Sequence, residues 1–238
     1  MTGIIALWAA PRSRSTAFFR SMVEHGDVVA LHEPLCNLVD FGETTVLDRV
    51  VRTPAELIEV VTGIARTRTV FFKDTTDQRY PEILADTAFL REARHTFLIR
   101  TPAEVASSFY ALKPDMQVSD IGIENQHEIL EAVRVAGGAP AVVIDSADLV
   151  TAPEATMANY CAEVGLPFRP EALNWQAGAR PEWERSDRWH QDVAASTGFS
   201  ARTSQYANTV ENDPRLAAFS AHHEPFYQLL RAQRLVTA

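Results

Sequence analysis

Cysteine and long apolar runs are scarce in this chain of 238 residues. The two cysteines, Cys36 and Cys161, have no CxxC partner, which excludes a disulfide framework and favours buried free thiols in a reducing compartment. No apolar run reaches the roughly 18 residues that span a bilayer. The N-terminal segment lacks the basic region of a signal peptide and fits a buried first strand better. We therefore expect a cytoplasmic protein without a membrane partner.

Positive charge is also scarce. The formal net charge is −9, and only Lys73 and Lys113 among the 22 basic residues are lysines. Proteins that bind duplex nucleic acid normally carry a basic surface, so we expect no nucleic-acid partner. An acidic protein that binds an anion has to use a few local arginines, and the positions of these arginines are therefore informative.

Short apolar segments alternate with helical patterns from residue 3 to about residue 165. Such alternation indicates right-handed βαβ units, and hence an α/β fold with a parallel sheet and helices on both faces. We predict strands over 3–10, 28–31, 69–73, 95–100 and 141–144, and helices over 15–25, 54–66, 102–112, 121–135 and 153–164.

The composition, 46% hydrophobic and 22% charged, is typical of a globular chain, and its length suits one large domain. We predict a single domain over 1–238, with a core over about 3–167 and a C-terminal segment over about 168–238. Residues 170–215 are rich in Trp, Arg, Pro and Ser and lack periodicity, which suits a lid or a pocket wall. A closing helix is expected over about 214–235.

The loop after the first strand runs from Pro11 to Thr16 and leads directly into a helix. Backbone N–H groups at a helix N-terminus bind anions, and guanidinium and hydroxyl groups add donors. The loop is not a Walker A motif, because Ala9 and Arg14 stand at the glycine positions and Ser15 at the lysine position. This disfavours a Mg-nucleotide kinase but not phosphate binding. The predicted binding residues are Arg12, Ser13, Arg14, Ser15, Thr16 and Ala17.

A second candidate anion site follows the fourth predicted strand. Arg100 ends this strand, and Ser108 lies eight residues later, two turns into the next helix. In open parallel sheets, ligands bind beyond the carboxyl ends of the strands, so both sites face the same edge. Arg100 and Ser108 are therefore predicted to hold a second phosphate.

The combination of the two motifs is more specific than either motif alone. A strand, turn and helix with Pro-Arg-Ser-x-Ser-Thr, followed by a strand that ends Arg-x-Pro-x-x-Val-x-x-Ser, resembles the PAPS-dependent sulfotransferase family. PAPS is 3′-phosphoadenosine-5′-phosphosulfate. Segments 143–149 and 161–167 are similar to that family's later strand, acidic turn and Leu-Gly-Leu-Pro helix end. The resemblance covers about residues 3–167 and points to the bacterial small-molecule type.

The resemblance implies a P-loop-like sulfotransferase fold with an irregular or helical C-terminal extension. PAPS would be the co-substrate and PAP the product, with no metal. The first loop would hold the 5′-phosphosulfate, and Arg100 and Ser108 the 3′-phosphate. Arg14 replaces the family's loop glycine, so the loop is either tighter or uses Arg14 on the ligand. The family's C-terminal Arg-Lys-Gly loop is absent, and Arg202 is the nearest candidate for its phosphate contact.

Sulfuryl transfer to a hydroxyl needs a base that deprotonates the acceptor, and two segments of the chain offer candidates. Cytosolic small-molecule enzymes of the family carry a catalytic histidine after the third strand, but Lys73-Asp74-Thr75 stands there in this chain. His32 and Glu33 end the second strand, beside the first loop if those two strands are neighbours. Leu31-His32-Glu33-Pro34 is similar to the Glu-Pro segment of bacterial carbohydrate sulfotransferases. This resemblance implies that Glu33 is the base.

His32 is the alternative candidate for the base. Asp74 is the third candidate, if neither Glu33 nor His32 takes the proton. Successive strand residues point to opposite faces, so only one of His32 and Glu33 is expected to face the ligand. Partial burial is expected to raise the pKa of the Glu33 carboxyl toward the operating pH. Arg12 and Lys73 would neutralise the charge that builds on the bridging and phosphate oxygens.

The remaining aromatic residues and histidines give weaker signals. His190, His222 and His223 suggest a metal, but no ligand partner stands at helical spacing, so we predict none. Trp175, Trp183 and Trp189 fit an acceptor pocket and core packing equally well.

The sequence as a whole predicts sulfuryl transfer from PAPS to the hydroxyl, or less favourably the amine, of a small-molecule acceptor. Two alternatives remain open. One is an ATP-dependent phosphotransferase, and the other is a non-catalytic nucleotide-binding protein with the same fold. No motif names the acceptor, and the choice between a monomer and a homodimer is left open.

Overall fold

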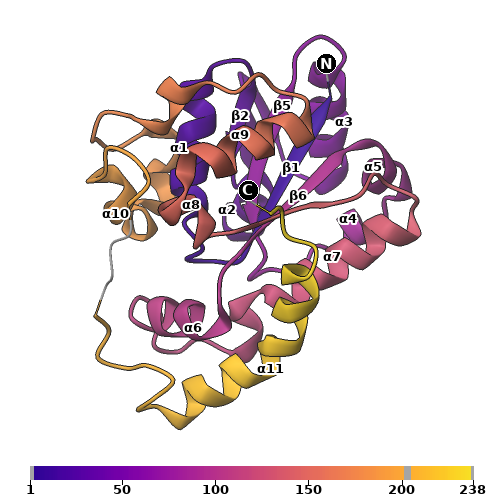
Figure 1. Ribbon diagram of the computed structural model, residues 1–238. Coiled ribbons are helices and arrows are strands. Elements are labelled where there is room, and N and C mark those ends of the chain that lie inside the picture. Colours follow the sequence, from indigo (N-terminus) through magenta and orange to yellow (C-terminus); the bar gives the residue numbers. More distant parts are fainter. Residues whose placement is uncertain (1–2, 201–204, 237–238) are drawn as a thin grey trace.

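The computed structural model describes residues 3–200 and 205–236, and the predicted Arg202 contact lies outside them. A central five-stranded parallel sheet has the order β2-β5-β1-β6-β7 (Figure 1). The α/β fold with a parallel sheet is thereby confirmed. The strands are β1 (Ile4–Ala9), β2 (Val29–His32), β5 (Val70–Thr75), β6 (Arg94–Ile99) and β7 (Val142–Asp145).

Helices cover both faces of the sheet (Figure 1). Side chains of β1 alternate between two buried clusters, because successive strand residues point to opposite faces. Ala6 and Trp8 pack with α3, α5, α6, α7 and α11, whereas Ile5 and Leu7 pack with α1 and α9. The bounds are α1 (Ser15–His25), α3 (Pro54–Ala65), α4 (Pro81–Ala85), α5 (Thr87–Glu92), α6 (Pro102–Tyr110), α7 (Ile123–Val135), α8 (Asp148–Thr151), α9 (Pro153–Val164) and α11 (Pro214–Arg231).

Local sequence signals explain where several helices begin and end. Proline opens α3, α6 and α9, where its missing N–H costs no intrahelical hydrogen bond. The Thr53 side chain accepts a hydrogen bond from the Glu56 N–H at 3.2 Å and caps α3. Gly165 ends α9 with φ 72°, a left-handed conformation that glycine adopts readily.

The structure differs from the sequence-based expectations in several places, including the short helices α4, α5 and α8, which were not predicted. Strand β5 lies between β1 and β2, so the second strand is not the direct neighbour of the first. Pro34 begins a helix, α2 (Pro34–Phe41), where the sequence indicated only the end of a strand. A hairpin of β3 (Thr44–Val46) and β4 (Arg49–Val51) was not expected, because three-residue strands are too short to show alternation.

The C-terminal segment has little regular structure before α11. It contains the 3-10 helices η2 (Pro170–Leu173) and η3 (Pro181–Trp189) and the short helix α10 (Gln191–Ala194). The closing helix ends at Arg231, earlier than expected. Among the described residues, no helix has both the length and the apolar character needed to cross a membrane.

Candidate active site

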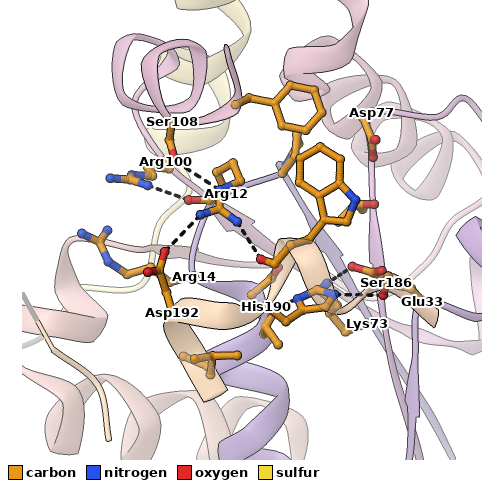
Figure 2. A pocket seen from close by; sticks show the side chains of 18 of the residues that line it. Arg12, Arg14, Glu33, Lys73, Asp77, Arg100, Ser108, Ser186, His190 and Asp192 are labelled. Atoms are coloured by element: carbon orange, nitrogen blue, oxygen red, sulfur yellow. Dashed lines mark hydrogen bonds and ion pairs between the residues drawn. The ribbon is translucent and has the colours of Figure 1, made fainter. Parts of the chain in front are cut away.

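A pocket opens at the carboxyl edge of the sheet, where ligands bind in parallel α/β folds (Figure 2). Its cavity has a volume of about 320 Å³. The loops after β1, β2, β5 and β6 line one side, and the C-terminal segment lines the other. The structure therefore brings most of the predicted site residues together. On the wall are Arg12, Arg14, Ser15, Thr16, Ala17, Glu33, Lys73, Arg100 and Ser108.

The loop after β1 holds two arginines in a left-handed backbone conformation. Arg12 has φ 60° and Arg14 has φ 67°, a region that costs a non-glycine residue about 1 kcal/mol. Arg14 therefore keeps the backbone geometry that a glycine at this position would adopt. Its guanidinium donates to Ser146 Oγ at 3.3 Å and lies at the pocket wall. The pocket end formed by Arg12, Arg14 and Arg100 is called the arginine end below.

Arg12 connects three parts of the chain. Its Nε donates to Ser108 Oγ at 3.1 Å, and its Nη1 donates to the Trp189 carbonyl at 2.8 Å. Its Nη2 pairs with the Asp192 carboxylate at 3.3 Å. Tyr206 also donates to Ser108, at 2.9 Å. The loop, α6 and the C-terminal segment therefore converge on one guanidinium, whose pKa burial lowers.

Arg100 retains an unused donor. Its Nη1 donates to the Arg12 carbonyl at 2.6 Å, and its Nη2 pairs with Glu104 at 3.1 Å. Its Nε is buried without a hydrogen-bond partner among the described residues. Ser13 Oγ is also buried and unpartnered, but Ser13 is not on the pocket wall, contrary to the expectation for this side chain. A buried donor without a partner is costly, and an oxyanion would satisfy the Arg100 Nε.

Glu33 and Lys73 form a buried ion pair in the pocket (Figure 2). The pair exists because β2 and β5 are neighbours, with His32 opposite Lys73 in the register. Glu33 follows β2 with φ 49°, outside the strand alternation. Burial alone would raise the pKa of the Glu33 carboxyl, but Lys73, His32 and His190 lower it to about 2. The expectation of a raised pKa is therefore wrong.

His32 is not on the pocket wall. Its ring packs edge-on against Phe19 at 4.9 Å and lies 5.6 Å from the Trp183 ring. Burial lowers the pKa of this imidazole, which keeps it neutral. The other reserve candidate, Asp74, accepts the backbone N–H groups of Leu35 and Cys36, both at 2.9 Å. Asp74 thus holds the start of α2 and has no free face toward a substrate.

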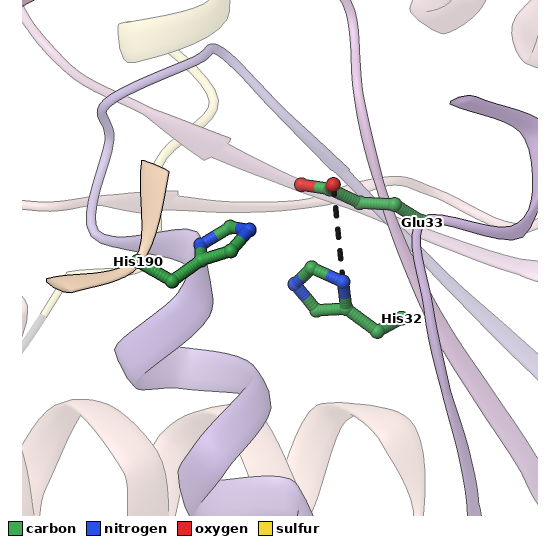
Figure 3. Close-up of side chains that lie close together, drawn as sticks. All are labelled: His32, Glu33 and His190. Atoms are coloured by element: carbon green, nitrogen blue, oxygen red, sulfur yellow. Dashed lines mark ion pairs between the residues drawn. The ribbon is translucent and has the colours of Figure 1, made fainter. Parts of the chain in front are cut away.

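His190 enters the pocket from the C-terminal segment. Its Nδ1 lies 2.9 Å from Thr16 Oγ1, and its Nε2 lies 3.1 Å from Ser186 Oγ. Burial lowers the pKa of His190 to about 4. His190, His32 and Glu33 place ligand atoms within 4.8 Å of one another (Figure 3). The sequence singled out each of these residues but could not place them together, because His190 lies far along the chain from His32 and Glu33.

The His32, Glu33 and His190 cluster has the ligand types of a zinc site. The Lys73 ammonium already neutralises Glu33, however, and both ring nitrogens of His190 have hydroxyl partners. A cation would have to displace these groups. The arrangement therefore suits the holding and transfer of a proton better than the binding of a metal ion.

One of the three candidate tryptophans lies at the pocket. Trp189 lines it and stacks on Phe109, with ring centroids 5.3 Å apart. Trp175 and Trp183 are buried and are not on the wall. His222 and His223 belong to α11, where they contact Glu124 and the Val118 carbonyl. Pocket residues that the sequence did not single out include Asp40, Asp77, Asp192 and Tyr206.

Asp192 occupies the face of Arg12 that an anionic ligand would need, so its removal should favour anion binding. For Asp192→Asn we expect inorganic pyrophosphate, used as a probe anion, to bind about 1.4- to fivefold more tightly, because an exposed ion pair is worth roughly 0.2–1 kcal/mol. Isothermal titration with pyrophosphate measures this. Asp187→Asn, an exposed change in the same segment, should leave the affinity unchanged. Weaker pyrophosphate binding in the Asp192 variant alone would show that Asp192 supports the site.

Comparisons with known proteins complete the description of the site. A family model described as "Sulfotransferase domain" matches residues 2–234. Two Arabidopsis thaliana proteins, named branched-chain-amino-acid aminotransferase-like protein 2 and protein 1, are 29% and 28% identical over 83% of this chain. The match covers 36% and 37% of their lengths, so the chain spans about a third of these curated relatives.

Three solved structures share the fold. The sulfotransferase domain of the Synechococcus PCC 7002 olefin synthase is 18% identical, with a TM-score of 0.54 over 93% of this chain and 94% of that one. The sulfotransferase domain from the curacin biosynthetic pathway is 16% identical, with a TM-score of 0.55 over 94% and 98%. A sulfotransferase from Alicyclobacillus acidocaldarius is 12% identical, with a TM-score of 0.55 over 99% and 97%.

Proposed function

The chain belongs to the sulfotransferase domain family, and on that premise we propose that it transfers the sulfuryl group of PAPS to the hydroxyl of a small-molecule acceptor. An amine is the less favoured acceptor group. The observation that carries the proposal is the convergence of both anion-binding motifs and the Glu33–Lys73 pair on one pocket. The resemblance seen in the sequence to the sulfotransferase family is confirmed.

The arginine end has the donors that a nucleotide with two phosphate positions requires. The first N–H groups of α1 have no intrahelical partners and lie at the pocket through Ser15, Thr16 and Ala17. We assign the 5′-phosphosulfate to these groups and to Arg12. The unpartnered Nε of Arg100 and the hydroxyl of Ser108 are assigned to the 3′-phosphate. Charge-assisted hydrogen bonds of this kind are among the strongest in proteins.

The reaction joins the acceptor oxygen to sulfur and breaks the bond between sulfur and the bridging oxygen of the donor. The products are the sulfate ester, PAP and one proton. Glu33 takes that proton from the acceptor hydroxyl. Lys73 and Arg12 face the oxygens on which negative charge increases, and stabilise the leaving phosphate. Both cations line the pocket beside Glu33 and the α1 N-terminus.

Lys73 pairs with Glu33 and strongly favours the ionised carboxylate. An anionic donor bound in the same pocket would compete with Glu33 for Lys73, and burial would then raise the pKa of Glu33. Donor binding would thus make Glu33 a stronger base at the moment when a base is needed.

Two alternatives remain, a phosphotransferase that uses ATP and a binding protein without turnover. The absence of a lysine at the Walker position of the first loop disfavours the phosphotransferase. The buried Glu33–Lys73 pair at the pocket wall favours an enzyme over a binding protein.

Thermal unfolding in the presence of different nucleotides distinguishes these functions. PAP should raise the melting temperature without added metal, and EDTA should not change the shift, because arginines and the α1 N-terminus supply the positive charge. ATP with Mg²⁺ should stabilise the protein less than PAP. Stabilisation by ATP with Mg²⁺ but not by PAP would exclude the proposed function. PAP binding without turnover over a broad acceptor set would favour the binding protein.

A further inference from the structure

Two carboxylates of the pocket wall have no part in the proposed reaction. Asp40 comes from α2. Asp77, labelled in Figure 2, comes from the segment that follows β5. Neither has an ion-pair partner within 4.0 Å among residues 3–200 and 205–236. The Oδ1 of Asp77 is buried and lacks any hydrogen-bond partner in the same ranges. A buried acceptor of this kind is costly unless a ligand supplies a donor.

The nearby cations have other partners. Lys113 pairs with Asp120 at 2.8 Å, and Lys73 pairs with Glu33. Arg188 stacks over the Trp189 ring at 4.7 Å. Among the described residues, Asp40 receives a hydrogen bond from the Cys36 thiol, at 3.6 Å, and from no other group. In that part of the chain, the wall around Asp40 and Asp77 therefore has two carboxylates without ion pairs, in contrast to the arginine end of the same pocket.

An aromatic surface belongs to the same pocket. Phe109 and Trp189 both line the pocket and stack with an angle of 19° between their planes. Lys113 Nζ lies 5.9 Å from the centroid of the Phe109 ring, and the Arg188 guanidinium lies 4.7 Å from that of Trp189, so cations of this chain already occupy these ring faces. The two rings therefore form an apolar part of the pocket wall. An orphaned carboxylate oxygen and a second carboxylate without an ion pair match the chemistry of a protonated amine.

We propose that the acceptor carries an ammonium group, which Asp77 and Asp40 bind while the acceptor hydroxyl faces Glu33. The substrate class is thus an amino alcohol or an aminophenol, rather than a neutral alcohol or a polyol. This inference rests on the proposed function for the identity of the pocket as an acceptor site. The ammonium preference itself is a binding property and is measurable without turnover.

Matched probes test the preference directly. Tyramine and 4-ethylphenol differ in an ammonium group, as do 3-aminopropan-1-ol and butan-1-ol. Isothermal titration of the wild-type protein, alone and with saturating PAP, should show the ammonium member binding at least about 10-fold more tightly in one or both pairs. Equal affinity within both pairs, or no binding by any probe, would overturn the inference.

Variants locate the preference at Asp77. Asp77→Asn keeps the shape and one acceptor oxygen, and should reduce ammonium-probe affinity about 10-fold or more while leaving the neutral probes within about twofold. Asp40→Asn should give a smaller loss of the same kind, because Asp40 is exposed. Asp48→Asn, an exposed change of equal charge outside the pocket wall, should change nothing. Equal losses for charged and neutral probes would refute the assignment.

A stability measurement excludes misfolding of the Asp77 variant. Burial, with Glu33 and Asp40 nearby, raises the pKa of Asp77 from 3.8 to about 6 despite a hydrogen bond from Thr75. The folded state therefore binds this proton more tightly than the unfolded state, and stability decreases as the pH rises from about 3.8 through about 6. Asp77→Asn should melt at a higher temperature than wild type at pH 8, without that gain at pH 4.

Failure of the inference and failure of the proposed function give different results. If PAP does not stabilise or bind the protein, the proposed function fails, whereas an ammonium preference in the protein alone still supports the inference. If PAP binds but the ammonium preference is absent, the inference fails, whereas the proposed function stands.

Discussion

Glu33→Gln should lower kcat by about 10²–10⁴-fold, because Gln keeps the shape and one acceptor oxygen but cannot take a proton near neutral pH. PAP affinity should change little, since we assign the carboxylate to the acceptor and the arginine end to the nucleotide. Steady-state turnover with PAPS and a sulfated-product assay measure the first effect. Titration with PAP measures the second.

His32→Asn is the matched comparison for Glu33→Gln. The structure keeps His32 off the pocket wall and packs its ring on Phe19, so we expect a lower melting temperature with turnover largely retained at low temperature. Near-normal turnover in Glu33→Gln combined with lost turnover in the folded His32→Asn protein would assign the base to His32. Loss of both turnover and melting temperature in the two variants would make the pair structural.

Arg100→Ala should weaken PAP binding about 10- to 150-fold, the equivalent of about 1.5–3 kcal/mol for hydrogen bonds to a charged group. The same variant should bind an analogue that lacks the 3′-phosphate almost as well as wild type does. The physical reason is the buried Nε of Arg100, which has no hydrogen-bond partner among the described residues. Titration of both ligands against both proteins gives the comparison.

The analogue without the 3′-phosphate also distinguishes two roles of Arg100, recognition of the 3′-phosphate and support of the loop after β1. Arg100 holds the Arg12 carbonyl at 2.6 Å, and its loss will disturb the loop to some degree. Such a disturbance weakens both ligands equally, so equal losses would assign Arg100 a structural role. Arg134→Ala removes an exposed pair with Glu131 on α7 and should change neither affinity.

The sequence predicted the sheet well because its signals are local. The apolar run Ile4–Ala9 is buried and pairs in parallel with both of its neighbours, as continuous hydrophobic strands require. The first loop could likewise be placed at the pocket from its position after a strand. Its residues Arg12 and Arg14 line the wall, as the helix N-terminus and the topology together imply.

Other features of the candidate site could not be predicted from the sequence, because they depend on contacts between distant segments. The pKa of Glu33 is set by Lys73 on a neighbouring strand, and the strand order was not readable from the sequence. His190 and Asp192 approach the first loop from a segment without periodicity. Asp77 is distinguished by a buried Oδ1 that has no hydrogen-bond partner in the described part of the chain, a property that only the three-dimensional structure reveals. In each case the decisive contact joins residues that are at least 40 positions apart or depends on a partner being absent.

The left-handed residues of the pocket also bear on how this protein would respond to selection for heat resistance. Arg12, Arg14 and Glu33 all hold a backbone conformation that glycine adopts without strain. At Arg14, whose guanidinium donates to Ser146 Oγ at 3.3 Å, replacement by glycine relaxes the backbone and removes a charge from the site. Glycine at Glu33 would instead leave the buried Lys73 without its counter-ion, and glycine at Arg12 would remove its contacts with α6 and the C-terminal segment. Screens that reward survival at high temperature alone should therefore enrich the change at Arg14 and yield robust proteins with poor turnover. Selection on activity, by contrast, preserves the strained positions.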